Sequence, residues 1–108
     1  MELTDITKEI YAAGHRLGKG PTELFTLARK AAEAERVYRK ALAIEIMRLR
    51  LDKFPATLIL DLARGNCSEE KFARDLAEAE MTAGRDGLRA IITQVTALQS
   101  ILRHQTEV

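Results

Sequence analysis

The stretch PATLILDLARGN, residues 55–66, lies between two longer charge-rich segments whose apolar residues recur with helical spacing. Its proline disfavours helical geometry at the preceding Phe54, so the helix before it should end there. Residues 57–64 then have the length of a two-turn helix, and the Gly-Asn pair that follows is a typical helix end. The stretch therefore predicts a short helical corner between two long helices.

Two interpretations of this corner follow from its excess of leucine and isoleucine. In the first, Leu58, Ile59 and Leu62 form one face that belongs to the core and closes the open end of a helical hairpin. Leu60 lies about 160° from Leu62 around the helix and should point away from that core. In the second interpretation, the apolar side chains bind a second copy of the chain or another protein.

The rest of the sequence predicts three further helices. The first covers residues 4–17, where one apolar stripe recurs at steps of three and four, and a Gly-Lys-Gly-Pro sequence should end it. The second covers residues 21–53. The third covers residues 68–104, with Ser68 as its N-cap, and its second half has the near-heptad spacing of a coiled coil.

Composition agrees with an all-α fold. Of the 108 residues, 46% are hydrophobic and 31% charged, which fits a folded chain, while an aromatic content of 5% favours helices over strands. Because a short segment joins the two long helices, we expect a long antiparallel helical hairpin with a short N-terminal helix. The length fits a single domain over residues 1–108.

One face of the helix over residues 21–53 should form the core of this hairpin. Its apolar positions are Leu24, Leu27, Ala31, Ala34, Tyr38, Leu42, Ile46 and Leu49. If the chain folds back near residue 60, Tyr38 lies opposite Ala83 and Gly84, and Ala28 lies opposite Leu88. Large residues would then face small ones, and Ala83→Leu should overpack the core.

The second half of the same helix is apolar on two opposite sides. Val37, Ile44, Met47 and Leu51 fall about 180° from Leu42, so they need a second neighbour. We therefore predict a homodimer or a higher homo-oligomer, and another protein is a further candidate partner. The candidate interaction residues are Val37, Ile44, Met47, Leu51, Leu58 and Leu60.

Basic residues suggest an alternative function as a nucleic-acid-binding accessory factor. Arg29, Arg36 and Lys40 fall within one arc of the helix over residues 21–53 and could follow a phosphate backbone. Glutamates interrupt the series and no ladder of aromatic residues accompanies it, so a solvated helix face is favoured. The formal net charge is only +1, which provides no global attraction for nucleic acid or membrane.

The residues that carry chemistry form no recognisable constellation. The chain has one cysteine, Cys67, and two histidines, His15 and His104, one near each end. A helix dipole could lower the pKa of the Cys67 thiol, but no histidine is placed to activate it, so an inert thiol is favoured. We expect no catalytic residues, no cofactor and no metal site. Without an apolar run long enough to span a bilayer, a cytosolic protein is expected.

Four runs of sequence resemble a known group of proteins: ERVYRKALA at 35–43, FPATLI at 54–59, DLARG at 61–65 and KFARDLAEA at 71–79. They are similar to small uncharacterised proteins encoded by phages and prophages of Gram-positive bacteria. The resemblance covers about residues 25–102 and implies an accessory protein of the bacterial host cytosol, in the context of replication and recombination. It implies a host or phage protein as a candidate partner, and it implies no site residues.

Overall fold

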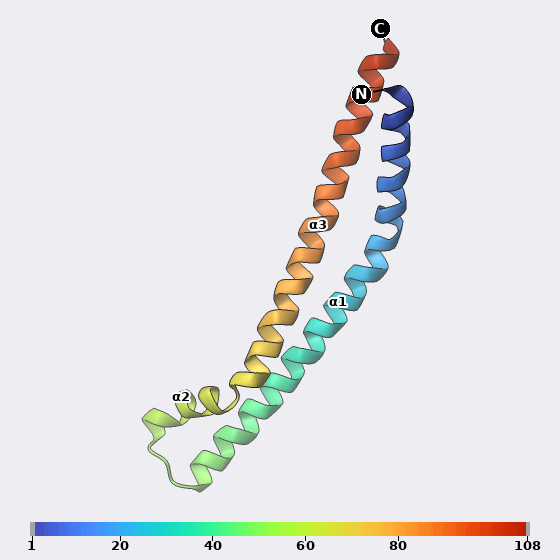
Figure 1. Ribbon diagram of the computed structural model, residues 1–108. Helices are drawn as coiled ribbons and strands as arrows, with labels where there is room; N and C mark the ends of the chain where they lie inside the picture. The colour runs from blue at the N-terminus through green and yellow to red at the C-terminus, as the bar shows by residue number, and fades with distance from the viewer. Residues whose placement is uncertain (1, 108) are drawn as a thin grey trace. The chain divides into compact units, whose positions relative to one another are not determined.

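The computed structural model describes residues 2–107, which form three helices and no strand. Figure 1 shows α1 (Leu3–Leu51), α2 (Ala56–Asn66) and α3 (Ser68–Glu107). The chain divides into two compact units. The terminal unit is the described part of Met1–Thr26 and Thr82–Val108, and the central unit is Leu27–Met81. In each unit α1 runs antiparallel to α3, so the prediction of an all-α helical hairpin is confirmed; the prediction of a single domain stays a prediction.

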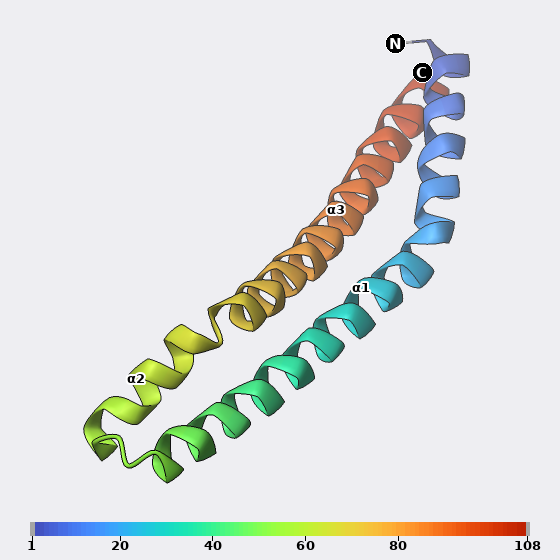
Figure 2. The same ribbon diagram turned by 60° about the horizontal axis from the view of Figure 1, so that its bottom comes forward.

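The predicted break between a short N-terminal helix and a second helix is wrong, because α1 continues from Leu3 to Leu51 with Pro21 inside it. Proline lacks the N–H that would bond to the carbonyl of Leu17, and its ring crowds that carbonyl, so a bend is expected here. Figure 2 shows that α1 bends in its light-blue part, which the colour bar places near residue 20. Local sequence therefore distorts the helix at this point without ending it.

Packing within the terminal unit holds both sides of this bend. Ile6 and Ala13 of α1 and Leu98 of α3 are buried. A Cβ atom at Gly20 would lie only 3.5 Å from Cγ of Leu88 and even closer to its Cδ1, so the glycine lets the two helices approach. The predicted pairing of Leu88 with Ala28 is thus wrong, since Leu88 packs against Gly20.

In the central unit the chain folds back at residues 52–55, which is earlier than predicted. The N–H of Phe54 donates to the carbonyl of Leu49 at 3.1 Å, and the N–H of Lys53 donates to the carbonyl of Arg50 at 3.1 Å. Lys53 has a φ of 61°. These two hydrogen bonds around a left-handed residue form a Schellman motif, which ends α1. Pro55 then precedes α2 (Figures 1 and 2).

The predicted corner helix exists, but it packs along α1 with a different face from the one expected. Leu49 of α1 is buried with Ile59 and Ala63 of α2, and Ala63 is completely inaccessible to solvent. Leu58 and Leu62, which were expected in the core, are 50% and 38% exposed. The close approach of α2 to α1 explains why Leu58 and Leu62 lie outside the core. Ile59 and Ala63 are one helical turn apart and so lie on the same face of α2, and Ala63 is small enough for the position where the two helices are closest.

The junction from α2 to α3 is almost continuous. The expected helix end at Gly65 and Asn66 does not occur there: both residues belong to α2, and Cys67 alone separates the helices. Its N–H donates to the carbonyls of Ala63 and Gly65, while its own carbonyl accepts a hydrogen bond from the N–H of Lys71. The chain therefore makes its only sharp reversal between residues 2 and 107 at residues 52–55.

The predicted register between α1 and α3 is wrong for this reason. A fold-back near residue 60 would bring Tyr38 to Ala83 and Gly84, whereas the guanidinium of Arg74 lies 4.6 Å from the centre of the Tyr38 ring. Ala83 is exposed, so Ala83→Leu has no core layer to overpack. The expected inner face of α1 is correct, since Ala31, Tyr38 and Leu49 are buried.

We expect Lys53→Gly to raise the free energy of unfolding by about 1 kcal/mol, because a left-handed conformation costs residues with a Cβ atom about 1–2 kcal/mol. The measurement is urea denaturation followed by circular dichroism. Arg29→Gly, at an exposed position inside α1, is the control and should lower stability by about 1 kcal/mol. A loss of stability in both variants would contradict the left-handed conformation of Lys53.

We also expect Gly18→Ala and Gly20→Ala to differ. A Cβ atom at Gly18 would meet nothing within 4 Å, so alanine there should add about 1 kcal/mol of stability through its helix propensity. At Gly20 the new methyl group must displace Leu88, which offsets part or all of this gain. Thermal unfolding of the two variants side by side measures the difference, and equal melting temperatures would show that Gly20 does not contact α3.

Candidate functional site

The first candidate surface is an apolar stripe on the outer side of α1, formed by Val37, Ile44, Met47 and Leu51. These side chains are 47%, 58%, 63% and 79% exposed. Tyr38 and Leu49, on the opposite side of the same helix, are 6% and 2% exposed. The structure thus places all four predicted residues on the side of α1 that faces away from the core of the central unit. We call this surface the outer stripe.

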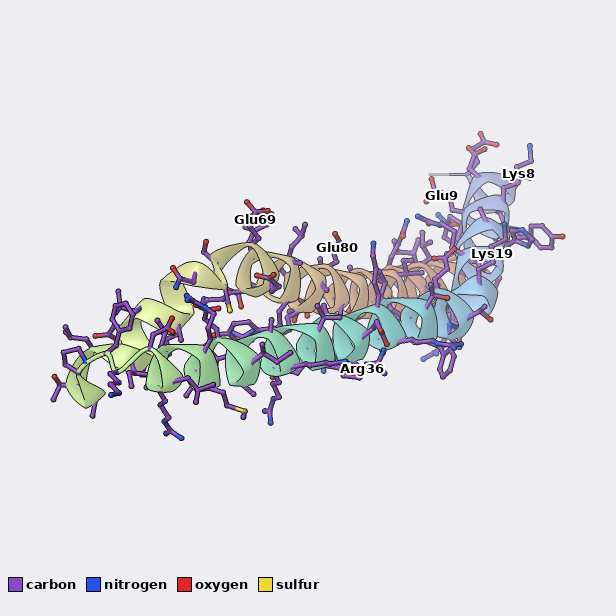
Figure 3. The ribbon with its side chains drawn as sticks, turned by 90° about the horizontal axis from the view of Figure 1, so that it is seen from below. Lys8, Glu9, Lys19, Arg36, Glu69 and Glu80 are labelled. Atoms are coloured by element: carbon purple, nitrogen blue, oxygen red, sulfur yellow. The ribbon has the colours of Figure 1, made fainter. Side chains whose placement is uncertain are left out.

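Two of the three predicted nucleic-acid residues border the outer stripe. Arg36 and Lys40 line a shallow hollow of about 340 Å³ together with Val37, Ala41 and Ile44. Figure 3 shows Arg36 on the side of α1 that points away from α3. Arg36 forms an ion pair with Glu33 one turn earlier, so part of its charge is already compensated. Arg29 is exposed as well, and contact of this series with nucleic acid stays a prediction.

The two predicted interaction residues of α2 lie on different sides of that helix. Leu58 is 50% exposed and Leu60 is 43% exposed. About 200° of helical rotation separates their side chains, with Ile59 buried between them. Leu60 lines a hollow of about 210 Å³ with Ile46, Arg50, Ala56 and Ile59. Leu60 therefore points away from the core but toward the seam between α1 and α2.

A second hollow of about 580 Å³ continues along this seam, and the sequence did not predict it. Ile46 lines both hollows, so they adjoin on the central unit, and we call the two together the lateral groove. Its apolar side chains are Tyr38, Leu42, Ala43, Ile46, Ala56, Ile59 and Leu60. Its charged side chains are Glu35, Arg39, Arg50, Arg64, Lys71 and Arg74. No sequence pattern predicted it, because α1 lines one wall and α2 and α3 line the other, in a register that the pattern left undetermined.

Arg74 is the best-fixed cation of the lateral groove. Its guanidinium lies over the ring of Tyr38, and its Nη2 donates to Oδ1 of Asp75 at 3.0 Å, while Nε lies 3.6 Å from Oε2 of Glu35. The hydrogen bond to Asp75 raises the pKa of Arg74. Hydrogen bonds from Lys71 and Arg74 lower the pKa of Asp75. This network holds the side chains of Arg74 and Lys71 against Tyr38 and Asp75.

A second polar network ties α2 to the end of α1. The side-chain amide of Asn66 donates to Oε1 of Glu45 at 2.9 Å, and Arg48 forms ion pairs with Glu45 and with Asp52. Hydrogen bonds from Arg48 and Asn66 lower the pKa of Glu45. These groups therefore position α2, and with it the wall of the lateral groove.

Cys67 lies at the junction of α2 and α3 and is buried, with 5% of its surface exposed. Burial raises the pKa of its thiol, and the carboxylates of Glu70 and Glu45 raise it further. The lowering by a helix dipole that was considered from the sequence is thus wrong, because desolvation and two nearby negative charges disfavour the thiolate.

Among residues 2–107 no group of three or more histidine, cysteine, aspartate or glutamate side chains is arranged to hold a metal ion. Over the same residues, none of the three helices contains a segment long and apolar enough to cross a membrane. In comparisons with known proteins, the chain matches no family model, no curated protein and no solved structure.

We expect the Cys67 thiol to react at least about tenfold more slowly with Ellman's reagent at pH 8 than an exposed thiol on the same chain, because it is buried and its pKa is raised. The matched control is the double variant Cys67→Ala/Ser68→Cys, which moves the thiol one residue to an exposed position. In 6 M guanidinium chloride the two proteins should react at about the same rate. Equal rates in the folded proteins would contradict the burial of Cys67.

Proposed function

We propose that this protein is a non-enzymatic accessory protein, of the kind encoded by phages and prophages, that acts through helix-mediated self-association and protein–protein interaction. The observation that carries the proposal is the outer stripe, whose four large side chains are 47–79% exposed on the side of α1 opposite its core. Single exposed apolar residues are common on protein surfaces, but aligned ones mark interfaces.

The spacing of the outer stripe supports helix-to-helix association. Val37, Ile44 and Leu51 are separated by seven residues each, and Met47 falls between the last two. These four residues match the a positions and one d position of a coiled-coil seam, in which β-branched and long apolar side chains interdigitate with those of a second helix. The other d position is Lys40, and Arg36 borders the stripe as charged residues flank such seams.

The exposed area of the chain also favours association. Its solvent-accessible surface is 8072 Å². A compact monomer of 12.1 kDa exposes about 6000 Å². The chain therefore exposes about 2000 Å² more than a compact monomer. A permanent homodimer can form by burying roughly 1000 Å² on each subunit, which is less than this difference. A second copy bound on the outer stripe would therefore remove from water apolar surface that one chain leaves uncovered.

We expect the protein to have the mass of a dimer or a higher oligomer at micromolar concentration, and Ile44→Asp to raise the dissociation constant by about a hundredfold or more, because it would bury an unpaired charge in the apolar contact. Sedimentation equilibrium measures the association. Circular dichroism establishes whether the variant keeps its helices.

Ala32→Asp is the matched control, since it places the same charge at an exposed position on another side of α1. It should leave the mass unchanged. A monomeric wild-type protein, or equal effects of the two substitutions, would overturn self-association through the outer stripe. Salt-sensitive binding of duplex DNA that is lost in Arg36→Glu, with no self-association, would instead support the nucleic-acid alternative.

A further inference from the structure

The lateral groove is a second apolar surface, separate from the outer stripe. Its lining starts at Glu35 and ends at Arg50 on α1, a distance of about 22 Å at 1.5 Å per residue. Leu60, at 43% exposure, lies along it. A hollow of this length, with Leu42 and Ile46 in its floor, suits an extended element with several apolar side chains better than a compact small molecule.

The charged side chains of the lateral groove are mostly basic. Five basic side chains and one carboxylate, Glu35, line the lateral groove, although the whole chain carries a net charge of only +1. Among the residues that the structure describes, Arg50 and Arg64 form no ion pair, whereas Arg39 is paired with Glu35 and Lys71 with Asp75. Of these two arginines without a carboxylate partner, Arg50 lines the same hollow as Leu60, and Arg64 lines the neighbouring hollow, one helical turn after Leu60 on α2.

Part of the groove is pre-organised for an anionic partner. Arg74 is held between Tyr38, Asp75 and Glu35, and only 23% of its side chain is exposed. Asp75 and Glu35 compensate part of its charge, but its guanidinium is already ordered, so a contact with it costs little further side-chain entropy. Arg50 and Arg64 are exposed and can turn toward acidic groups at the edges of a bound segment.

We propose that the lateral groove binds an acidic amphipathic helix of a partner protein. Apolar side chains at i, i+3 or i+4 and i+7 of that helix would pack on Leu42, Ile46 and Leu60, and its acidic flanks would pair with Arg50 and Arg64. A phosphate backbone would meet the same cations but would leave the apolar floor uncovered, so the floor distinguishes a protein helix from nucleic acid.

The test uses two fluorescein-labelled 16-residue peptides, each with leucine at i, i+4, i+7 and i+11 and alanine elsewhere except at its flanking positions, which are glutamate in one peptide and lysine in the other. Fluorescence anisotropy follows their binding to the full-length chain. We expect the glutamate peptide to bind and the lysine peptide not to bind. Arg50→Glu/Arg64→Glu should weaken binding of the glutamate peptide about tenfold or more, and Leu60→Asp should do the same.

The matched control is Arg29→Glu/Arg36→Glu, which changes the net charge equally but lies outside the lateral groove. It should leave peptide binding unchanged, whereas added salt should weaken binding of the glutamate peptide, because it screens the exposed pairs with Arg50 and Arg64. Absence of binding by the glutamate peptide, or equal losses in the two double variants, would overturn the proposal. So would a 16-nucleotide single-stranded DNA that binds as tightly as the peptide and loses its binding in Arg50→Glu/Arg64→Glu.

Sedimentation of the Arg50→Glu/Arg64→Glu variant separates this inference from self-association. We expect its mass to equal that of the wild type, because neither arginine belongs to the outer stripe. Circular dichroism of Leu60→Asp should show unchanged helix content, since Leu60 is exposed. A conservative variant, Arg64→Gln, keeps the proposal testable if charge reversal disturbs the fold. It should weaken binding of the glutamate peptide, and the lysine peptide should still not bind.

Discussion

Two interactions of Leu49 determine where α1 ends. Its carbonyl accepts the hydrogen bond from the N–H of Phe54 that closes the turn, and its side chain packs with Ile59 and Ala63. The first interaction reverses the chain, and the second holds the returning helix against α1. Each requires the other, since a Schellman motif alone does not order a following helix and a contact among three side chains alone does not set a chain direction.

This constraint decides which side chains of the central unit reach solvent. α2 approaches α1 closely with the small residue Ala63, and the helical period then turns Leu58 and Leu60 to the flanks. On α3 the buried residue Ala77 is also small, while Phe72 is 68% exposed. Besides Tyr38, Leu49 and Ile59, the unit thus buries small residues between its helices, and it leaves many of its large apolar side chains exposed.

The two surfaces described on the central unit differ in chemistry. The outer stripe is apolar with charged borders and repeats along one helix, which suits a like helix of a second copy. The lateral groove requires α1, α2 and α3 together and combines an apolar floor with cations held by Tyr38 and Asp75. The two proposed partners, a second copy of the chain and an acidic helix, would therefore occupy different surfaces of the central unit.

The sequence by itself determined the helical class, the inner face of α1 from Ala31 to Leu49 and the apolar outer stripe, because each depends only on a period of about 3.6 residues along one helix. Only the tertiary structure decided that α1 passes through Pro21, that the chain reverses at residues 52–55 and that Arg74 lies over Tyr38. The physical reason is that α2 and α3 are each apolar on more than one side, so periodicity does not identify their inner faces. The register depends on where the chain reverses, and packing around Leu49 selects that point.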